Sequence, residues 1–171
     1  MSLELVLGPM FSGKSSYLLS SIRRYKEIGW SVYIITSSLD KRYTNDAKIV
    51  NHNREYAEAN CAVQNLYDVS SEILKSKVII IEEGQFYKDL VPYVIKLVEI
   101  HGKHVIVAGL DGDAQRKPFG SLLDLIPYAD SIVKLKALCK QCATDNCVND
   151  ALFTSKKIHD SSIIDIVLSC Y

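Results

Sequence analysis

The sequence predicts an α/β fold in which a parallel sheet of the P-loop, RecA-like type is covered by helices on both faces. The apolar runs 3–7, 32–36, 78–81 and 104–108 are continuous, which is typical of strands buried on both faces. Stretches with helical spacing separate these runs. A glycine-rich loop at 8–15 follows the first run directly, and no Gly-x-Gly-x-x-Gly dinucleotide fingerprint accompanies it.

Helices are expected where apolar side chains recur every three or four residues. The first such stretch, 14–28, places Leu18 and Ile22 on one face, and two more stretches at 66–75 and 90–101 separate the later strands. Ligands of open parallel sheets bind at the carboxyl ends of the strands. We therefore expect the functional site at that edge.

The last third of the chain departs from this alternation. The remaining expected elements are a glycine- and charge-rich loop, a short helix, a strand and two β-like runs, at 110–120, 121–126, 131–137, 151–154 and 163–168. A tail of this size is too small to bury a core of its own. We therefore expect two domains, a P-loop domain at 1–138 and a small metal-stapled domain at 139–171.

The overall charge is balanced. Twenty basic and twenty acidic side chains cancel, so the chain as a whole has no electrostatic attraction to nucleic acid or to an anionic membrane. The first twenty residues lack the pattern of a signal peptide, and no apolar run approaches the roughly 20 residues that span a bilayer. We expect a cytoplasmic protein that acts on a small molecule, with neither nucleic acid nor a membrane as partner.

The glycine-rich loop is a complete phosphate-binding sequence. It consists of Gly8, Pro9, Met10, Phe11, Ser12, Gly13, Lys14 and Ser15. In such a loop the backbone N–H groups point at phosphate oxygens, the lysine reaches the β and γ phosphates, and the serine hydroxyl can bind Mg²⁺. The helix that follows adds its positive dipole end. A nucleoside triphosphate is the predicted ligand.

Two acidic residues, Glu82 and Glu83, follow the strand at 78–81 directly. A carboxylate at this strand tip lies across from the phosphate-binding loop and can hold Mg²⁺ directly or through water. An adjacent carboxylate can accept the proton of an attacking hydroxyl. Together with the loop, the two acids predict a phosphoryl-transfer site.

Four of the five cysteines lie in the last third of the chain. In a reducing compartment such a cluster indicates metal binding before disulfides. A closed structural zinc site needs four ligands. We predict a zinc site of Cys139, Cys142 and Cys170, with Cys147 as the fourth ligand and His159 as the alternative.

Several motifs occur in the order seen in thymidine kinases of the cellular and poxvirus type. They are the loop 8–15, Asp40-Lys41-Arg42, Glu83-Gly84-Gln85-Phe86, Leu110-Asp111-Gly112, Gln115-Arg116-Lys117-Pro118-Phe119-Gly120 and Cys139-x-x-Cys142. The chain resembles that family over about 3–142. The resemblance implies that ATP, with Mg²⁺, phosphorylates the 5′-hydroxyl of deoxythymidine in pyrimidine salvage. It also implies a homo-oligomer, either a tetramer or a dimer.

The resemblance also implies roles for single residues. Glu83 matches the general base, and Lys14 and Arg42 would supply positive charge to the transferred phosphoryl group. Glu82 and Gln85 would belong to the site of ATP and Mg²⁺. The implied nucleoside contacts are Met10, Asp40, Phe86, Leu110, Phe119, Phe153 and Thr154.

The chain departs from the family pattern in the site and in the lasso, the loop that closes over the nucleoside. Glu82 replaces an aspartate, so a Mg²⁺ contact must readjust by one methylene. Ala114 replaces an aromatic ring that could stack on the base. In the lasso, Ile163 and Val167 stand in place of a tyrosine and a cysteine. Two alternatives stay open: a broader kinase acting on deoxyuridine or deoxycytidine, and a nucleotide-binding protein without turnover.

Overall fold

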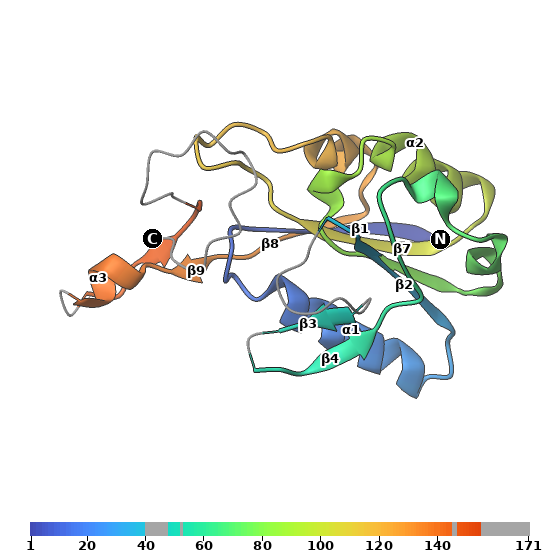
Figure 1. The fold of residues 1–171 in the computed structure, drawn as a ribbon, viewed down its shortest axis with the longest axis horizontal. Helices are drawn as coiled ribbons and strands as arrows, with labels where there is room; N and C mark the ends of the chain where they lie inside the picture. The colour runs from blue at the N-terminus through green and yellow to red at the C-terminus, as the bar shows by residue number, and fades with distance from the viewer. Residues whose placement is uncertain (40–47, 52, 145–146, 155–171) are drawn as a thin grey trace.

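The computed structural model describes residues 1–39, 48–51, 53–144 and 147–154. Figure 1 shows a central sheet with a helix layer on each side. Helix α1 (Lys14–Glu27) lies on one face and helix α2 (Leu90–Ile95) on the other. The predicted α/β architecture with a parallel sheet is therefore confirmed.

The main sheet has six strands in the order β5-β2-β6-β7-β1-β8, and all neighbouring strands are parallel. The strands are β1 (Ser2–Leu7), β2 (Val32–Ser37), β5 (Cys61–Val63), β6 (Val78–Ile81), β7 (His104–Gly109) and β8 (Ser131–Lys134). Central strand β6 shows why its sequence is apolar throughout. Ile79 packs in the core cluster on the α2 side, and Ile80 packs in the cluster on the α1 side.

Two of the expected helices differ from the prediction. The stretch expected as one helix at 66–75 forms two 3₁₀ turns, η1 (Leu66–Asp68) and η2 (Ser71–Lys75). The extended backbone of Val69 and Ser70 separates them, because the Ser70 hydroxyl caps η2 by accepting the N–H of Glu72. The stretch at 90–101 begins as α2 and continues as the π-helical turn η4 (Lys96–Ile100).

The structure also revises the segment after β7. The short helix expected at 121–126 is the 3₁₀ helix η5 (Leu122–Tyr128). The strand expected at 131–137 is split into β8 and β9 (Ala137–Leu138), and β9 leaves the main sheet to pair antiparallel with β10 (Asp150–Ala151). Only the first residue of the β-like run expected at 151–154 is in a strand, and the run at 163–168 lies outside the described residues.

Several short elements among the described residues were not predicted, including edge strand β5 and a 3₁₀ turn at Gly84–Phe86. Strands β3 (Lys48–Val50) and β4 (Tyr56–Glu58) pair antiparallel into a hairpin, which lies beside α1 in Figure 1. The short helix α3 (Lys140–Thr144) belongs to the unit with β9 and β10. Each of these elements has five residues or fewer, which is too short for a periodic pattern to appear.

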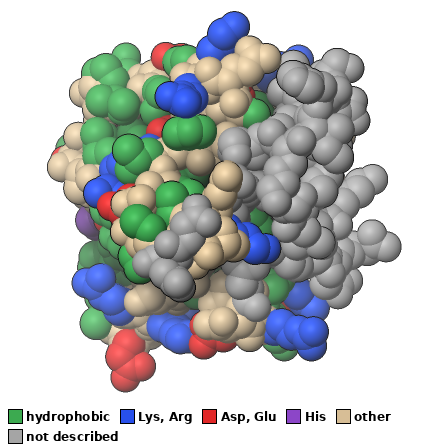
Figure 2. Space-filling view, turned by 90° about the vertical axis from the view of Figure 1, so that its left-hand side faces the viewer, with side chains coloured by type: hydrophobic (Ala, Val, Ile, Leu, Met, Phe, Trp, Pro, Cys, Tyr) green, Lys and Arg blue, Asp and Glu red, His purple; other side chains and the backbone are tan. Residues whose placement is uncertain are grey.

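The carboxyl ends of the parallel strands lie at one edge of the sheet, where the functional site is expected. In Figure 1, β1 runs from the N-terminus toward the left, so the carboxyl ends of the parallel strands face the left-hand edge, from which the α3, β9 and β10 unit projects. Figure 2 looks onto this edge and shows Lys and Arg side chains spread around it rather than gathered in one patch. No helix among the described residues combines the length and the apolar composition needed to cross a membrane.

The burial of two strand isoleucines predicts how much stability the fold loses when each is substituted. Ile80 of β6 is fully buried, whereas Ile132 of edge strand β8 is 45% exposed. We expect Ile80→Ala to lower the free energy of unfolding by about 2–5 kcal/mol, because it opens a cavity in the core. Ile132→Ala should cost about 1 kcal/mol or less. Urea denaturation measures both values, and equal losses would contradict this assignment of the core.

Candidate active site

The loop between β1 and α1 has the backbone shape of an anion-binding turn. Phe11 and Gly13 have φ values of 62° and 88°, and Gly13 is the N-cap of α1. No described side chain caps this helix end, so its first N–H groups face the loop. A Cβ on Gly8 would lie 2.7 Å from both the Leu135 carbonyl oxygen and the Ser12 hydroxyl, so glycine is required there.

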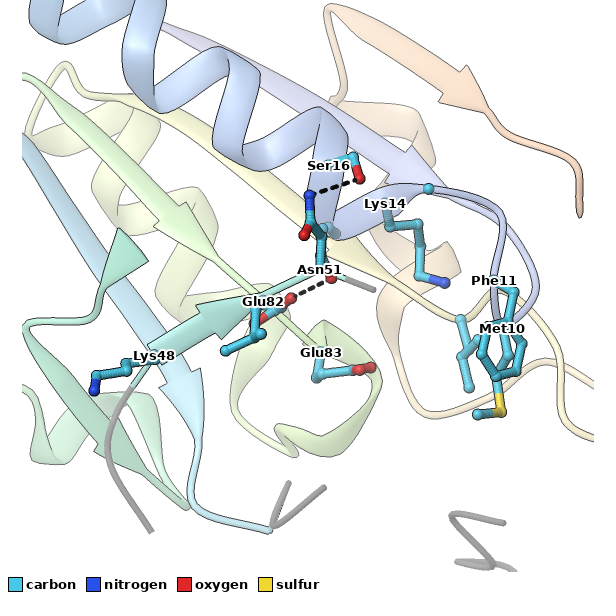
Figure 3. Close-up of a pocket in the computed structure, with 13 residues that line it drawn as sticks. Met10, Phe11, Lys14, Ser16, Lys48, Asn51, Glu82 and Glu83 are labelled. Atoms are coloured by element: carbon cyan, nitrogen blue, oxygen red, sulfur yellow. Dashed lines mark hydrogen bonds between the residues drawn. The ribbon is translucent and has the colours of Figure 1, made fainter. Parts of the chain in front are cut away.

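Lys14 reaches back over this loop. Its Nζ donates hydrogen bonds to the carbonyl oxygens of Gly8, at 3.1 Å, and Pro9, at 2.7 Å. Figure 3 shows the side chain leaving the start of α1 toward the segment that carries Met10 and Phe11. The ammonium group thus lies at the hollow of the loop, where it can exchange carbonyl oxygens for phosphate oxygens.

The two predicted magnesium neighbours contact each other. Ser15 Oγ donates a hydrogen bond of 2.8 Å to Glu82 Oε1. Glu82 is buried, and its backbone N–H donates to the Ile35 carbonyl at 3.0 Å, which extends the pairing of β6 with β2 by one residue. Glu82, which stands where the family pattern has an aspartate, is therefore long enough to contact Ser15 directly.

Glu83 sits in a tight turn after Glu82. Its φ of 55° is unusual for a non-glycine residue and turns the chain into the 3₁₀ turn η3 (Gly84–Phe86). Glu83 Oε2 accepts a 2.6 Å hydrogen bond from Gln85 Nε2, and Gln85 Oε1 accepts the N–H of Leu110 at 3.0 Å. Glu83, the predicted general base, is thus buried, and its carboxylate is hydrogen-bonded to Gln85 of the same turn.

These groups surround one cleft, with about 700 Å³ of empty space including its open mouth. Its lining comes from the loop, α1, the β3–β4 hairpin and the ends of β6 and β7: Met10, Phe11, Gly13, Lys14, Ser15, Ser16, Lys48, Val50, Asn51, Glu82, Glu83, Ala108 and Leu110. In Figure 3 the Glu83 carboxylate points toward the side where Met10 and Phe11 lie. The structure therefore brings together the loop, both acids and Leu110, as the sequence predicts.

The cleft also has a wall that sequence reasoning missed. Asn51, directly after β3, is buried, and its Nδ2 donates to Ser16 Oγ at 3.3 Å and to Glu55 Oε2 at 2.7 Å. The Asn51 amide and then Arg23 lower the pKa of the Glu55 carboxyl. Ser16 could have been found as the residue after the phosphate-binding motif. Nothing in the sequence around Asn51 marked it.

The described nucleoside contacts that the sequence predicts come from three places. Met10 and Leu110 line the cleft. Phe86 and Phe119 pack against each other edge to face, with ring centres 5.7 Å apart. Phe153 and Thr154 come from the segment after β10. The predicted nucleoside contact Asp40 and the predicted catalytic residue Arg42 lie outside the described residues.

The segment after β10 contacts the site directly. Thr154 Oγ1 accepts a 2.9 Å hydrogen bond from the backbone N–H of Met10. The Arg116 guanidinium lies 4.0 Å from the centre of the Phe153 ring, which is a cation–π contact. The C-terminal segment is therefore joined both to the phosphate-binding loop and to the glycine-rich loop at 110–120.

Hydrogen bonds connect three of the predicted zinc ligands, although they do not arrange them as a metal site. Asn149 Nδ2 donates to the sulfur atoms of Cys142 and Cys147, at 3.4 Å each, and the N–H of Cys142 donates to Cys139 Sγ at 3.4 Å. This last hydrogen bond lowers the pKa of the Cys139 thiol. Within the described part of the chain, no three Cys, His, Asp or Glu side chains form a group that could hold a metal ion. The other two candidates, Cys170 and His159, lie outside it.

The chain is similar to known proteins along most of its length. The family model described as thymidine kinase matches residues 1–168. The chain is 41% identical to human cytosolic thymidine kinase and 43% identical to the chicken enzyme, over 91% and 82% of its own length. It is 40% identical to the thymidine kinase of variola virus over 99% of its length. It spans 65% of the human protein, 61% of the chicken protein and 96% of the viral one.

The parallel sheet, the glycine-rich loop that opens α1 and the acids at the end of β6 together define an α/β protein of the P-loop class. The thymidine kinase family model matches nearly the whole chain, which identifies the family within that class. The chain belongs to the thymidine kinase family.

Proposed function

We propose that the protein is an ATP-dependent thymidine kinase that transfers the γ-phosphoryl group of ATP to the 5′-hydroxyl of deoxythymidine. The observation that carries the proposal is the 2.8 Å contact between Ser15 and Glu82, with the buried Glu83 beside it in the same cleft. Membership in the thymidine kinase family supports the choice of reaction and acceptor. The product is deoxythymidine monophosphate, a DNA precursor recovered by salvage.

The phosphate-binding loop would hold the triphosphate. Its backbone N–H groups and the uncapped start of α1 offer donors to phosphate oxygens. Lys14 already lies over the loop through its bonds to Gly8 and Pro9, and a phosphate would replace these neutral acceptors with charged ones. Positioning and neutralisation of charge are the main requirements of phosphoryl transfer. Arg42 is the further cation proposed for this role.

Ser15 and Glu82 fit a magnesium site. Mg²⁺ prefers oxygen ligands and is held by one or two protein groups together with phosphates. A hydroxyl and a carboxylate in direct contact at the mouth of the loop provide such a pair. When bound, the ion would neutralise charge on the β and γ phosphates.

Glu83 would act as the general base. As the 5′-oxygen forms its bond to the γ-phosphorus, the hydroxyl proton passes to the Glu83 carboxylate. The bond from the γ-phosphorus to the bridging oxygen breaks, and ADP leaves with that electron pair. Met10 and Leu110 line the cleft near this carboxylate and would contact the nucleoside. Phe86, Phe119, Phe153 and Thr154 would enclose it from the neighbouring loops.

Ala114 favours one alternative function. A small side chain in the loop at 110–120 leaves room where an aromatic ring would stack on the base. A broader deoxynucleoside kinase, which also accepts deoxyuridine or deoxycytidine, is therefore the second candidate. A cytoplasmic location and a homo-oligomeric assembly stay predictions.

A chromatographic assay tests the function. The protein is incubated with Mg-ATP and thymidine, deoxyuridine or deoxycytidine, and the 5′-monophosphates are separated. We expect thymidine monophosphate as the main product and its loss in Lys14→Ala. The exposed-lysine variant Lys75→Ala serves as the matched control. Product from another nucleoside alone would move the substrate assignment, and no product from any would favour nucleotide binding without turnover.

The role of Glu83 is tested separately. We expect Glu83→Gln to lower kcat by about 10² to 10⁴-fold, because an amide cannot take up the hydroxyl proton. The affinity for ATP, measured by calorimetry, should change less than about twofold, since the base acts on the acceptor. Glu58→Gln, an exposed substitution on β4, is the control. Retention of the rate within a few fold would refute the assignment.

We also propose a structural zinc site in the C-terminal unit, with Cys139, Cys142, Cys147 and Cys170 as ligands. Two observations support the choice of ligands: thiols are the donors that zinc prefers in structural sites, and hydrogen bonds connect Cys139 to Cys142 and join Cys142 and Cys147 through Asn149. These three thiols do not themselves form a group that could hold an ion, so zinc binding would have to draw them closer. His159 remains the alternative to Cys147.

Elemental analysis of the purified full chain tests this site. We expect one zinc per chain in the unaltered protein, and much less in Cys147→Ser because one of the four ligands is missing. Cys61→Ser, which alters a half-buried thiol on β5, should keep the metal. If His159→Ala loses zinc while Cys147→Ser keeps it, the fourth ligand is the histidine. Absence of zinc from the unaltered protein would remove the proposal.

A further inference from the structure

Gln85 is a buried polar residue that the proposed mechanism does not use. Its side chain lies behind the cleft and does not line it, and the residue is only 4% exposed. A buried primary amide needs hydrogen-bond partners for its N–H groups and for its oxygen. Here Nε2 donates to the Glu83 carboxylate at 2.6 Å, and Oε1 accepts the Leu110 N–H at 3.0 Å. The amide thus joins two residues that do line the cleft.

The backbone around Gln85 leaves little room for movement. Gly120, with a φ of 62°, approaches so closely that a Cβ there would lie 3.0 Å from the Gln85 carbonyl carbon. A Cβ on Gly109 would collide with the Gln85 amide oxygen itself. Gly120 therefore lies against the backbone of Gln85, and Gly109 lies against its side-chain amide. The amide is fixed in position between the turn after β6 and the end of β7.

The direction of the short hydrogen bond matters for the chemistry. A hydrogen bond donated to a carboxylate is shorter and stronger than one between neutral groups, so it can hold the carboxylate in one orientation. A general base must present a lone pair of its carboxylate to the acceptor hydroxyl, so the orientation of the carboxylate matters. One Glu83 oxygen is engaged by Gln85. The hydrogen bond thus fixes the rotation of the carboxylate about its last bond.

We propose that Gln85 is a positioning residue, which orients the Glu83 carboxylate while the Leu110 backbone N–H anchors the amide from the other side. This inference rests on the proposed function of Glu83 as the general base. It gives Gln85 a different role from the contact with ATP that the family resemblance implies.

Two substitutions distinguish the hydrogen bond to Glu83 from the hydrogen bond to Leu110. Gln85→Met keeps the length and removes both hydrogen bonds. Gln85→Glu keeps an oxygen that can accept the Leu110 N–H, but it places a second carboxylate against Glu83. If Gln85 positions Glu83, kcat should fall by about 10- to 100-fold in Gln85→Met and further in Gln85→Glu. If Gln85 only anchors Leu110, Gln85→Glu should resemble the unaltered protein, and that result would overturn the proposal.

The separation of kcat from KM provides the second readout. If Gln85 orients Glu83, Gln85→Met should lower kcat, while KM for the nucleoside changes less than about twofold. If Gln85 only anchors Leu110, which lines the cleft, KM for the nucleoside should rise and kcat should stay nearly unchanged. KM does not depend on how much of a variant is folded, so poor folding would not mimic the second result. A raised KM with an unchanged kcat would contradict the proposal.

A double-mutant cycle separates this inference from the proposed function. In a Glu83→Gln background, Gln85→Met should change the residual rate less than about twofold, because its effect passes through the carboxylate. A further 10-fold loss there would show an independent structural role and overturn the inference. If Glu83→Gln alone kept full activity, the assignment of the base would fail instead. Gln64→Met and Gln64→Glu, at an exposed position after β5, are the matched controls and should match the unaltered protein.

Discussion

Parallel pairing of β1, β7 and β6 determines where the groups of the site lie. Leu7 pairs with Gly109, and Ile81 pairs with Val107, so the three strands end within two residues of one another. The phosphate-binding loop, the two acids and Leu110 follow these ends directly. A shift of one residue in either pairing would move a whole strand to the opposite face and separate these groups. The packing of β6 on both sides opposes such a shift, because Ile79 and Ile80 fill different core clusters.

The site concentrates negative charge in a buried place. Glu82 and Glu83 are adjacent and both only 8% exposed, and burial of two carboxylates costs stability unless each is hydrogen-bonded or paired. Ser15 donates to the first and Gln85 to the second. Lys14 lies in the same cleft. The acids are thus supported by different elements, α1 for Glu82 and the turn at η3 for Glu83, which allows them different roles in one small volume.

The features predicted correctly from the sequence are those encoded by neighbouring residues. The continuous apolar runs identify the four central strands, and the spacing at 8–15 identifies the glycine-rich loop that opens α1. The wall of the cleft formed by Asn51 could not be predicted, because it depends on a hairpin with three-residue strands and on a contact with Ser16, 35 positions away. The bridge from Glu83 through Gln85 to Leu110 likewise depends on β6 and β7 being neighbours. The break at Val69 and Ser70 was missed because a capping serine can outweigh a helical pattern.

The hydrogen bond from the Met10 N–H to Thr154 Oγ1 has a thermodynamic consequence. Met10 belongs to the loop that would hold phosphate, whereas Thr154 belongs to the C-terminal segment, 144 positions further along the chain. A ligand that strengthens or breaks this bond from one side changes the free energy of the other side by the same amount. If the proposed function holds, this hydrogen bond would couple the affinity for the phosphoryl donor to the affinity for the acceptor, and the coupling would have equal size in both directions.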